Sequence, residues 1–327
     1  MSWTEQPFEK KMFERLTFQF SEALADEHYS RFKVVRNQLI KDIYPEISGT
    51  EPNLTKHDPS HIADVMKSVD RVIGDRYEDL SGMDLYFLGL IIIFHDSGNI
   101  EGREDHHTAS RIKHIYDSTL ASDKANYRQE RKLVSRAAQA HSSGKNIGLD
   151  ADTIKDLPVN DGIDGFDIKV QEMAVILRLS DELSEGPHRT SSYKINNALY
   201  DSNSRIYHEY AQITHIHIDR GTNRIAFTYN IEYQNKEQLE KLLEFTYRRI
   251  HKLDQERKYA RHYSRICSVF NKTTVAINIE SIDGKELVLN NCVLTDLTVP
   301  GEQYKALDQL YDNYKIQNIV SHFDSKI

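Results

Sequence analysis

The chain has 327 residues, of which 39% are hydrophobic and 28% are charged, a composition typical of a globular protein with one large or two ordinary domains. The formal net charge of −8 weighs against a protein that coats long nucleic acid, because such binding depends on many contacts between cations and phosphates. The sequence has no apolar run long enough for a membrane span and no apolar signal core at its start, and two cysteines are too few for a disulfide framework. We therefore expect a cytoplasmic protein with no membrane association.

The first part of the chain shows the apolar periodicity of helices. One helical segment is predicted over residues 5–45 and a second over residues 61–73. Residues 84–94, DLYFLGLIIIF, are ambiguous, because the three isoleucines favour a strand whereas the length of the run suits a buried helix. A polar loop is predicted over residues 144–167. Further helices are predicted over residues 106–120, 127–141 and 168–184.

The pattern changes in the last third of the chain. Residues 213–219 and 224–230 alternate apolar and polar side chains on either side of Arg220-Gly221-Thr222-Asn223, which predicts a β-hairpin. A long charged helix follows over residues 235–264. The stretches TVAINIE, KELVLN and CVLTDLTV then predict three more strands around an Asp283-Gly284 turn. The sequence therefore predicts a helical region followed by a smaller α+β region.

Imidazole and carboxylate side chains recur at the ends of the predicted helices. His95 and Asp96 directly follow the apolar run, although such a pair by itself is more often a helix cap beside a surface histidine. The other groups of this kind are His57, His61, His106, His107, His141 and Asp181. Such groups can converge in a helical bundle, and mixed imidazole and carboxylate ligands suit Mn, Fe, Zn, Co or Ni, so the pattern indicates a metal site.

The order His61, His95-Asp96, Asp181 resembles that of the HD superfamily of metal-dependent phosphohydrolases. "HIADV" is similar to the H-x-x-x-V of the family's first helix, and "FHDSGN" is similar to its HD doublet after an apolar run. "ILRLSDELSE" is similar to its last motif, L-R-x-[AS]-D-x-L, in which the aspartate is a metal ligand. The resemblance covers roughly residues 55–195.

This resemblance implies an all-helical domain, so residues 84–94 are interpreted as a helix. The predicted fold is mainly α, with an all-helical HD-domain bundle followed by a smaller α+β C-terminal domain. The predicted parts are an N-terminal helical segment over residues 1–50, an HD domain over residues 51–205 and an α+β accessory domain over residues 206–327.

By the same resemblance, one metal site is formed by His61, His95, Asp96 and Asp181. Many members of the superfamily hold a second ion through two more histidines, and the aspartate of the HD doublet bridges both ions. The resemblance assigns His141 and either His106 or His107 to this second ion. The spacing to Ser110 favours His106, and His107 would then contact substrate or point elsewhere. The implied cofactor is one or two divalent ions (Mn, Fe, Zn, Co or Ni, with Mg as a further option).

Three cationic residues are candidates for contact with a substrate phosphate. Many HD proteins read H-D-x-G-K, and this chain has Asn99 at the position of that lysine. We expect the cationic contacts to come from Arg103, Lys145 or Arg189, since a guanidinium can bind a phosphate through two parallel hydrogen bonds. The predicted catalytic residues are Asp96, Arg189 and Lys145, and the predicted substrate-binding residues are Asn99, Arg103 and His107.

The resemblance implies a metal-dependent phosphohydrolase or phosphodiesterase, in which a metal-activated water attacks a nucleotide, a cyclic nucleotide or a short oligonucleotide. Two alternatives stay open: a single-strand nuclease, and a catalytically silent nucleotide-binding regulatory module. The basic residues of the predicted helix 236–265, with Tyr247 and Tyr259 between them, suit a short single-stranded nucleic acid, but a solvated amphipathic helix shows the same pattern. The C-terminal domain is also a candidate surface for a homodimer.

Overall fold

The computed structural model describes residues 3–119, 127–142, 152–233, 235–296 and 307–324. Contacts between residues divide the chain into two compact units. The first unit comprises Met1–Ser184 with His262–Cys267, and the second comprises Glu185–Arg261 with Ser268–Ile327. The sequence-based boundaries after residues 50 and 205 differ from this division and stay predictions.

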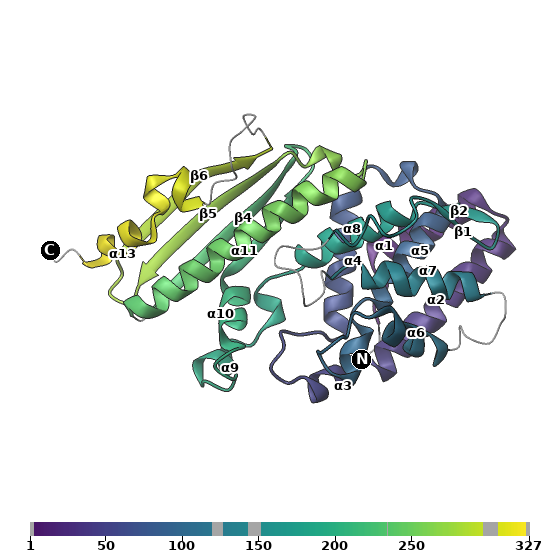
Figure 1. Ribbon diagram of the computed structural model, residues 1–327, viewed down its shortest axis with the longest axis horizontal. Coiled ribbons are helices and arrows are strands. Elements are labelled where there is room, and N and C mark those ends of the chain that lie inside the picture. The colour runs from purple at the N-terminus through teal and green to yellow at the C-terminus, as the bar shows by residue number, and fades with distance from the viewer. Residues whose placement is uncertain (1–2, 120–126, 143–151, 234, 297–306, 325–327) are drawn as a thin grey trace. The chain divides into compact units, whose positions relative to one another are not determined.

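The first unit is built mainly from helices (Figure 1). They are α1 (Pro7–Gln19), α2 (Glu22–Asp42), α3 (Tyr44–Thr50), α4 (Pro59–Ile73), α5 (Gly82–Phe94), α6 (Ala109–Asp117), α7 (Arg128–Gln139) and α8 (Val170–Glu182). Two short strands, β1 (Asp161–Ile163) and β2 (Phe166–Ile168), form a hairpin with Asp164 and Gly165 at positive φ in its turn. The prediction of a polar loop over residues 144–167 was wrong for this hairpin, because an Asp-Gly pair also forms the turn of a tight hairpin.

Helix α5 forms the centre of the first unit. All of its residues are buried, and it packs against α1, α2, α7 and α8. It begins with a capping box, in which Ser81 Oγ accepts the backbone N–H of Asp84 (2.9 Å) and the Asp84 carboxylate accepts that of Ser81 (2.9 Å). A helix that is buried on every side needs no polar face, which explains why its sequence lacks helical periodicity. The helical interpretation of residues 84–94 is confirmed.

The prediction of one helix over residues 5–45 was wrong, because the segment breaks at Phe20-Ser21 and again at Ile43, between α2 and α3. Phe20 and Ser21 have extended backbone, with ψ angles of 170° and 152°, and they separate α1 from α2. Serine favours such a helix start, since its hydroxyl competes with helical hydrogen bonds. The buried apolar residues of α1 at i, i+4 spacing are therefore Phe8, Met12 and Leu16, and Phe20 lies beyond the end of the helix.

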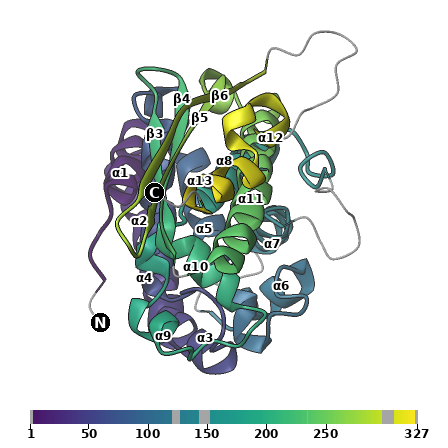
Figure 2. The same ribbon diagram turned by 90° about the vertical axis from the view of Figure 1, so that its left-hand side faces the viewer.

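The second unit combines helices with a four-stranded sheet. Its strands are β3 (Thr214–Asp219), β4 (Arg224–Tyr233), β5 (Lys272–Ser281) and β6 (Glu286–Thr295), and its main helices are α9 (Ser192–Asn196), α10 (Arg205–Ile213), α11 (Lys236–Tyr263), α12 (Leu307–Leu310) and α13 (Ile316–Asp324). The strand order is β3-β4-β5-β6, with antiparallel outer pairs and a parallel β4–β5 pair. The parallel pair requires a crossover, which α11 provides along one face of the sheet (Figures 1 and 2).

Strand β6 is one strand where the sequence predicted two. KELVLN and the start of CVLTDLTV lie in the same strand, and the register of its pairing with β5 shifts between Val275 and Ile277. A β-bulge of this kind absorbs an irregular position while pairing continues on both sides, so the two stretches need no turn between them. The end of CVLTDLTV, residues 297–299, lies outside the described residues.

The observed architecture confirms the predicted fold class, a mainly helical region followed by a smaller sheet-containing region. Across the described ranges, no helix combines the length and the apolar composition needed to cross a membrane.

Candidate metal centre

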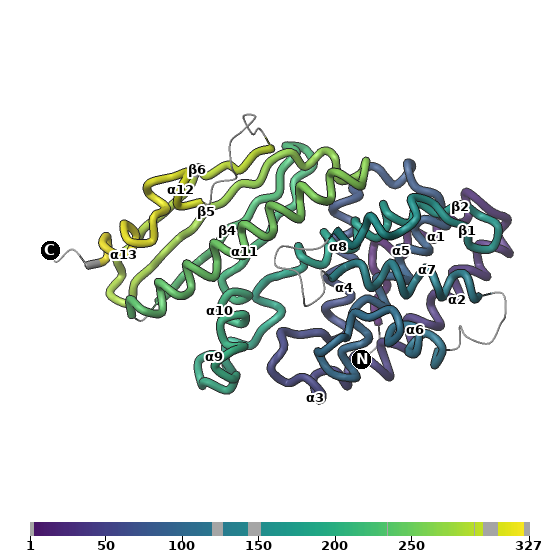
Figure 3. Tube along the Cα trace, in the orientation of Figure 1, coloured from purple at the N-terminus to yellow at the C-terminus, as the bar shows by residue number. Residues whose placement is uncertain are grey.

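Helix α4 begins two residues before His61. Its N-cap is Asp58, whose carboxylate accepts the backbone N–H of Ser60 (2.9 Å), and Pro59 occupies the first position, where an N–H would have no helical partner. This start places His61 in the first turn of a helix that packs against α8 (Figure 3). The side chain of His61 is 1% exposed, so the cap positions an imidazole in the interior.

The HD doublet stands at the C-terminal end of buried α5. The Nδ1 atom of His95 donates a hydrogen bond to the carbonyl oxygen of Ile92 (2.7 Å), which leaves its Nε2 atom to face the site. Asp96 follows, and the chain then enters a short 3-10 helix, Ser97–Glu101. The glycine of the motif, Gly98, is required here, because a Cβ atom on it would lie 2.0 Å from the carbonyl oxygen of His106.

Four side chains form a first ligand group: His61, His95, Asp96 and Asp181. Asp181 comes from the last turn of α8, and its Oδ1 atom lies 3.2 Å from His61 Nε2 and 3.6 Å from His95 Nε2. The Oδ2 atom of Asp96 lies 3.4 Å and 3.3 Å from the same two nitrogens. All four candidate ligand atoms lie within 4.8 Å of one another, so the structure brings together the four residues that the resemblance placed at one site.

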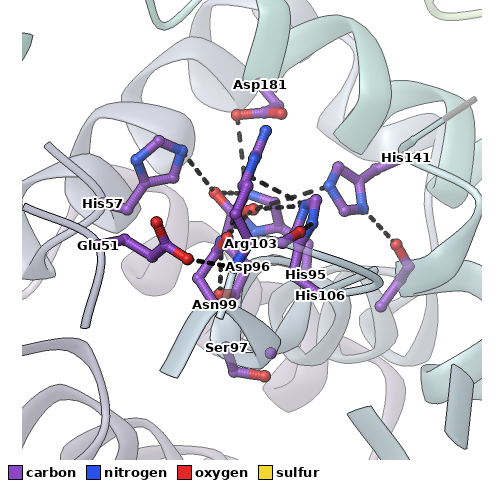
Figure 4. A network of polar contacts seen from close by, with 12 residues as sticks. Glu51, His57, His95, Asp96, Ser97, Asn99, Arg103, His106, His141 and Asp181 are labelled. Carbon is purple, nitrogen blue, oxygen red and sulfur yellow. Dashed lines mark hydrogen bonds and ion pairs between the residues drawn. The ribbon is translucent and has the colours of Figure 1, made fainter. Parts of the chain in front are cut away.

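Asp96, His106 and His141 form a second ligand group, and Asp96 belongs to both groups through different oxygens (Figure 4). Its Oδ1 atom lies 3.7 Å from His106 Nε2 and 3.8 Å from His141 Nε2. The Nδ1 atoms of His106 and His141 donate to the backbone carbonyls of Arg103 and Ala138, which leaves both Nε2 atoms on the side of Asp96. Within the described residues, this group contains His106 and does not contain His107.

Two of the predicted substrate-binding residues contact the second ligand group. Asn99 is buried, and its Nδ2 atom donates to Asp96 Oδ1 (3.1 Å). The Nη1 atom of Arg103 lies 3.1 Å from Asn99 Oδ1 and 3.1 Å from His106 Nε2 (Figure 4). The third, His107, has its ring centroid 5.2 Å from that of His106.

Three other candidates have different positions. His57 lies beside the first ligand group, with its Nε2 atom 3.6 Å from Asp96 Oδ2. Lys145 lies outside the described residues. Arg189 belongs to the second unit, in a 3-10 helix over Pro187–Arg189, and its contact with a substrate stays a prediction.

Two residues that the sequence analysis did not single out hold the backbone before the doublet and the backbone of Arg103 after it. Tyr44 of α3 is fully buried, and its hydroxyl donates to the carbonyl oxygen of Ile93 (3.0 Å) just before the doublet. The Oε1 atom of Glu51 accepts the backbone N–H of Arg103 (2.5 Å). Both residues come from the segment between α2 and α4, which lies outside every motif, so no sequence signal pointed to them.

Burial and neighbouring charges shift the pKa values of the histidines in opposite directions in the two groups. Burial lowers the pKa of His95, but the negative charges of Asp96 and Asp181 outweigh this and raise it to about 10. Burial favours a raised pKa for both carboxyls, yet the neighbouring imidazoles hold the pKa of each well below its usual range. Burial lowers the pKa of His106 to about 3 and that of His141 to about 4. The first group thus favours a positive charge at its centre, and the second offers neutral imidazoles.

The chemistry of the first group fits a divalent cation. The Nε2 atoms of His61 and His95 are buried and have no hydrogen-bond partner among the described residues. Buried polar atoms without a partner are uncommon, and a cation bound by both nitrogens and both carboxylates would satisfy them. Two imidazoles and two carboxylates are a donor set for Mn, Fe, Zn, Co or Ni. This buried His/Asp group can therefore hold a metal ion.

The basic residues of α11 contribute to the packing of the second unit. Arg257 is fully buried, and its Nη2 atom donates to Asp254 Oδ1 (2.7 Å). The hydroxyl of Tyr247 donates to the carbonyl oxygen of Tyr314 (2.7 Å). These contacts favour a structural role for this part of the helix, and binding of a single-stranded nucleic acid stays a prediction.

Comparison with models of protein families identifies the family of the chain. The model of HD-CE, an HD-type domain family, matches residues 51–259, more than half of the chain, and this range includes every residue of both ligand groups. The chain belongs to the HD-CE family. Membership confirms the resemblance to the HD superfamily. No curated protein and no solved structure matches the chain. An HD-CE domain with a buried His/Asp group that can hold a metal ion indicates a hydrolase of the metal-dependent HD type.

Proposed function

We propose that this HD-CE protein is a metal-dependent phosphohydrolase or phosphodiesterase. Its substrate would be a phosphate ester or anhydride of a nucleotide, a cyclic nucleotide or a short oligonucleotide. The observation that carries the proposal is the position of Asp96, whose Oδ2 atom faces the first ligand group and whose Oδ1 atom faces the second. A carboxylate in this position can bridge two ions, and paired ions about 4 Å apart are a common centre for hydrolysis of phosphate esters.

The ligand roles follow from the two groups. His61, His95, Asp96 and Asp181 would hold one ion, and Asp96, His106 and His141 would hold the other. Bound ions at such a site supply an activated water and neutralise charge on the phosphoryl oxygens. The protein's part is orientation, because backbone carbonyls hold the rings of His95, His106 and His141 in place before any substrate arrives. Asp96 is the proposed catalytic residue because it contacts both groups.

The cation for the substrate phosphate is proposed to be Arg103, with help from Lys145 and Arg189. Support for Arg103 comes from its Nη1 atom, which lies at hydrogen-bond distance from Asn99 and His106, beside the second ligand group. A guanidinium in this position can donate two parallel hydrogen bonds to a phosphoryl group. For Lys145 and Arg189 the support is the sequence alone.

A nucleotide panel tests the proposal. Protein loaded with Mn²⁺ is incubated with nucleotides, cyclic nucleotides and short oligonucleotides, and release of phosphate or nucleoside monophosphate is measured. We expect Asp96→Asn to lower the rate by about a hundredfold or more. The matched control is Asp64→Asn, which removes a carboxylate from α4 that belongs to neither ligand group.

The alternatives make different predictions in the same assay. A catalytically silent regulatory module would bind a nucleotide and Mn²⁺ without turnover. A single-strand nuclease would cleave oligonucleotides and leave mononucleotides intact. Equal rates for the wild type and Asp96→Asn on every compound would contradict the proposed hydrolase.

A further inference from the structure

The two ligand groups differ in whether side chains outside the group hold their ligand atoms. In the first group, the Nε2 atoms of both histidines have no hydrogen-bond partner within the described part of the chain. In the second group, Asn99 Nδ2 donates to Asp96 Oδ1 (3.1 Å), and Arg103 Nη1 lies 3.1 Å from His106 Nε2. The nitrogens of the first group therefore face the carboxylates of the same group, at 3.2–3.6 Å, whereas two ligand atoms of the second group are held by side chains outside it.

Arg103 contacts both nitrogens of the His106 imidazole ring. The Nδ1–H of His106 donates to the carbonyl oxygen of Arg103 (2.9 Å), so the Nε2 atom carries the lone pair and accepts a hydrogen bond from the guanidinium. One lone pair can bind an N–H donor or a metal ion, but not both. The same Nη1 atom also donates to Asn99 Oδ1 (3.1 Å), which gives the guanidinium a second partner in this position.

We propose that Arg103 is a latch on the second ligand group, which therefore accepts its ion only after the guanidinium has moved away. This inference rests on the proposed function of the site. The guanidinium blocks the second ion in two ways. It occupies the lone pair of His106 Nε2, and its positive charge, which arginine keeps at all accessible pH values, repels the cation. The first ion is then resident in the resting protein, and the second binds together with the substrate.

The structure also indicates what moves and what releases the latch. The backbone of Arg103 is held at both ends, since its N–H donates to Glu51 Oε1 (2.5 Å) and its carbonyl accepts from His106. The residue as a whole is exposed, so the side chain can swing toward solvent while the backbone stays in place. A phosphoryl group is the chemical class that draws it away, because its oxygens accept paired hydrogen bonds from a guanidinium.

Metal titration tests the latch without an activity assay. Chelator-treated protein is titrated with Mn²⁺ by equilibrium dialysis, and magnetic coupling between paired ions is followed by electron paramagnetic resonance. We expect the wild type to bind one ion tightly and a second at least about tenfold more weakly, and Arg103→Met to tighten the second ion by about tenfold or more. Arg103→Gln is expected to act in the same way.

Two controls locate the effect. Arg71→Met removes the same charge from an exposed position in the last turn of α4, and it should leave both affinities unchanged. His106→Ala combined with Arg103→Met should abolish the gain in affinity for the second ion, because this gain requires the Nε2 atom that the guanidinium releases.

Inorganic phosphate tests release of the latch. It should raise the affinity for the second ion more in the wild type than in Arg103→Met, since only the wild type has a latch to open.

The outcomes separate the latch from the proposed function. Equal affinities for both ions in the wild type, or an unchanged second-ion affinity in both Arg103 variants, would overturn the latch and leave the hydrolase proposal standing. An equal effect of phosphate on the wild type and Arg103→Met would overturn release by a phosphoryl group. A wild type that binds no Mn²⁺ at all would overturn the latch and the proposed function together.

Discussion

The proton on His95 offers a direct test of how the first ligand group is organised. Burial lowers the pKa of this imidazole, but Asp96 and Asp181 outweigh burial and raise it from 6.5 to about 10 in the folded protein. A group whose pKa is raised by folding contributes its full stabilisation below the unfolded pKa, and loses it as the pH rises through the folded pKa. The metal-free protein is therefore expected to become less stable as the pH rises from 6.5 toward 10.

The size of the effect follows from these two pKa values. The side chain of His95 is 0% exposed, so the shift of about 3.5 pH units needs no discount for solvent screening and corresponds to at most about 5 kcal/mol. Linkage makes the free energy of unfolding fall by up to about 1.4 kcal/mol per pH unit while only the folded state holds the proton. Between about pH 6.5 and about pH 9.5 the total loss is about 3–4 kcal/mol.

The assay is urea unfolding of chelator-treated protein at several pH values in this range. The variant His95→Asn should lose the decline, because it has no imidazole to protonate. The control His114→Asn changes a histidine whose side chain is 77% exposed, and it should keep the decline. A decline of the same size in His95→Asn, or a flat profile in the wild type, would refute the reasoning. Saturating Mn²⁺ should also remove the decline, since the ion takes the place of the proton.

Three further predictions concern residues that support the site or the second unit. Asp58→Ala removes the N-cap of α4 and should lower the free energy of unfolding by about 1 kcal/mol in urea titrations. Gly98→Ala places a Cβ atom 2.0 Å from the carbonyl oxygen of His106, so it should weaken the second ion more than the first in Mn²⁺ titrations. Asp254→Ala removes one of the two carboxylates that pair with the fully buried Arg257 and leaves the other, Asp296, 2.8 Å from its Nη1 atom. It should destabilise the protein by about 3 kcal/mol in urea unfolding, and the double variant Asp254→Leu with Arg257→Met should recover most of that loss.

Local sequence patterns were sufficient where local physics determines the structure. The alternation over residues 213–219 and 224–230 predicted the hairpin, because each strand of the sheet buries alternate side chains. Periodicity alone was not sufficient for residues 84–94, because a helix buried on all sides has no polar face to mark it. The resemblance to the HD superfamily resolved that ambiguity.

The errors arose where a local signal has two structural meanings. Asp164 and Gly165 suggested a loop, and they form the turn of a hairpin. The helix predicted over residues 5–45 has a break at Ser21, where a serine compatible with a helix surface instead begins a new helix. The two strands predicted after residue 285 are a single strand with an irregular register. In each case the outcome depends on what packs against the segment, and a short window of sequence does not contain that information.

The motifs by themselves indicated which imidazoles and carboxylates could share one centre. Each of these residues lies in a helix or close to a helix end, and adjacent residues set such ends through helix caps and buried apolar runs. Tertiary structure alone decided how those side chains are used. It directed the two oxygens of Asp96 to different ligand groups, placed His106 beside one of these oxygens, and brought the guanidinium of Arg103 to the Nε2 atom of His106. The physical reason is distance: such contacts are made over a few ångströms between segments that are far apart along the chain or separated by a turn, and only packing sets that geometry.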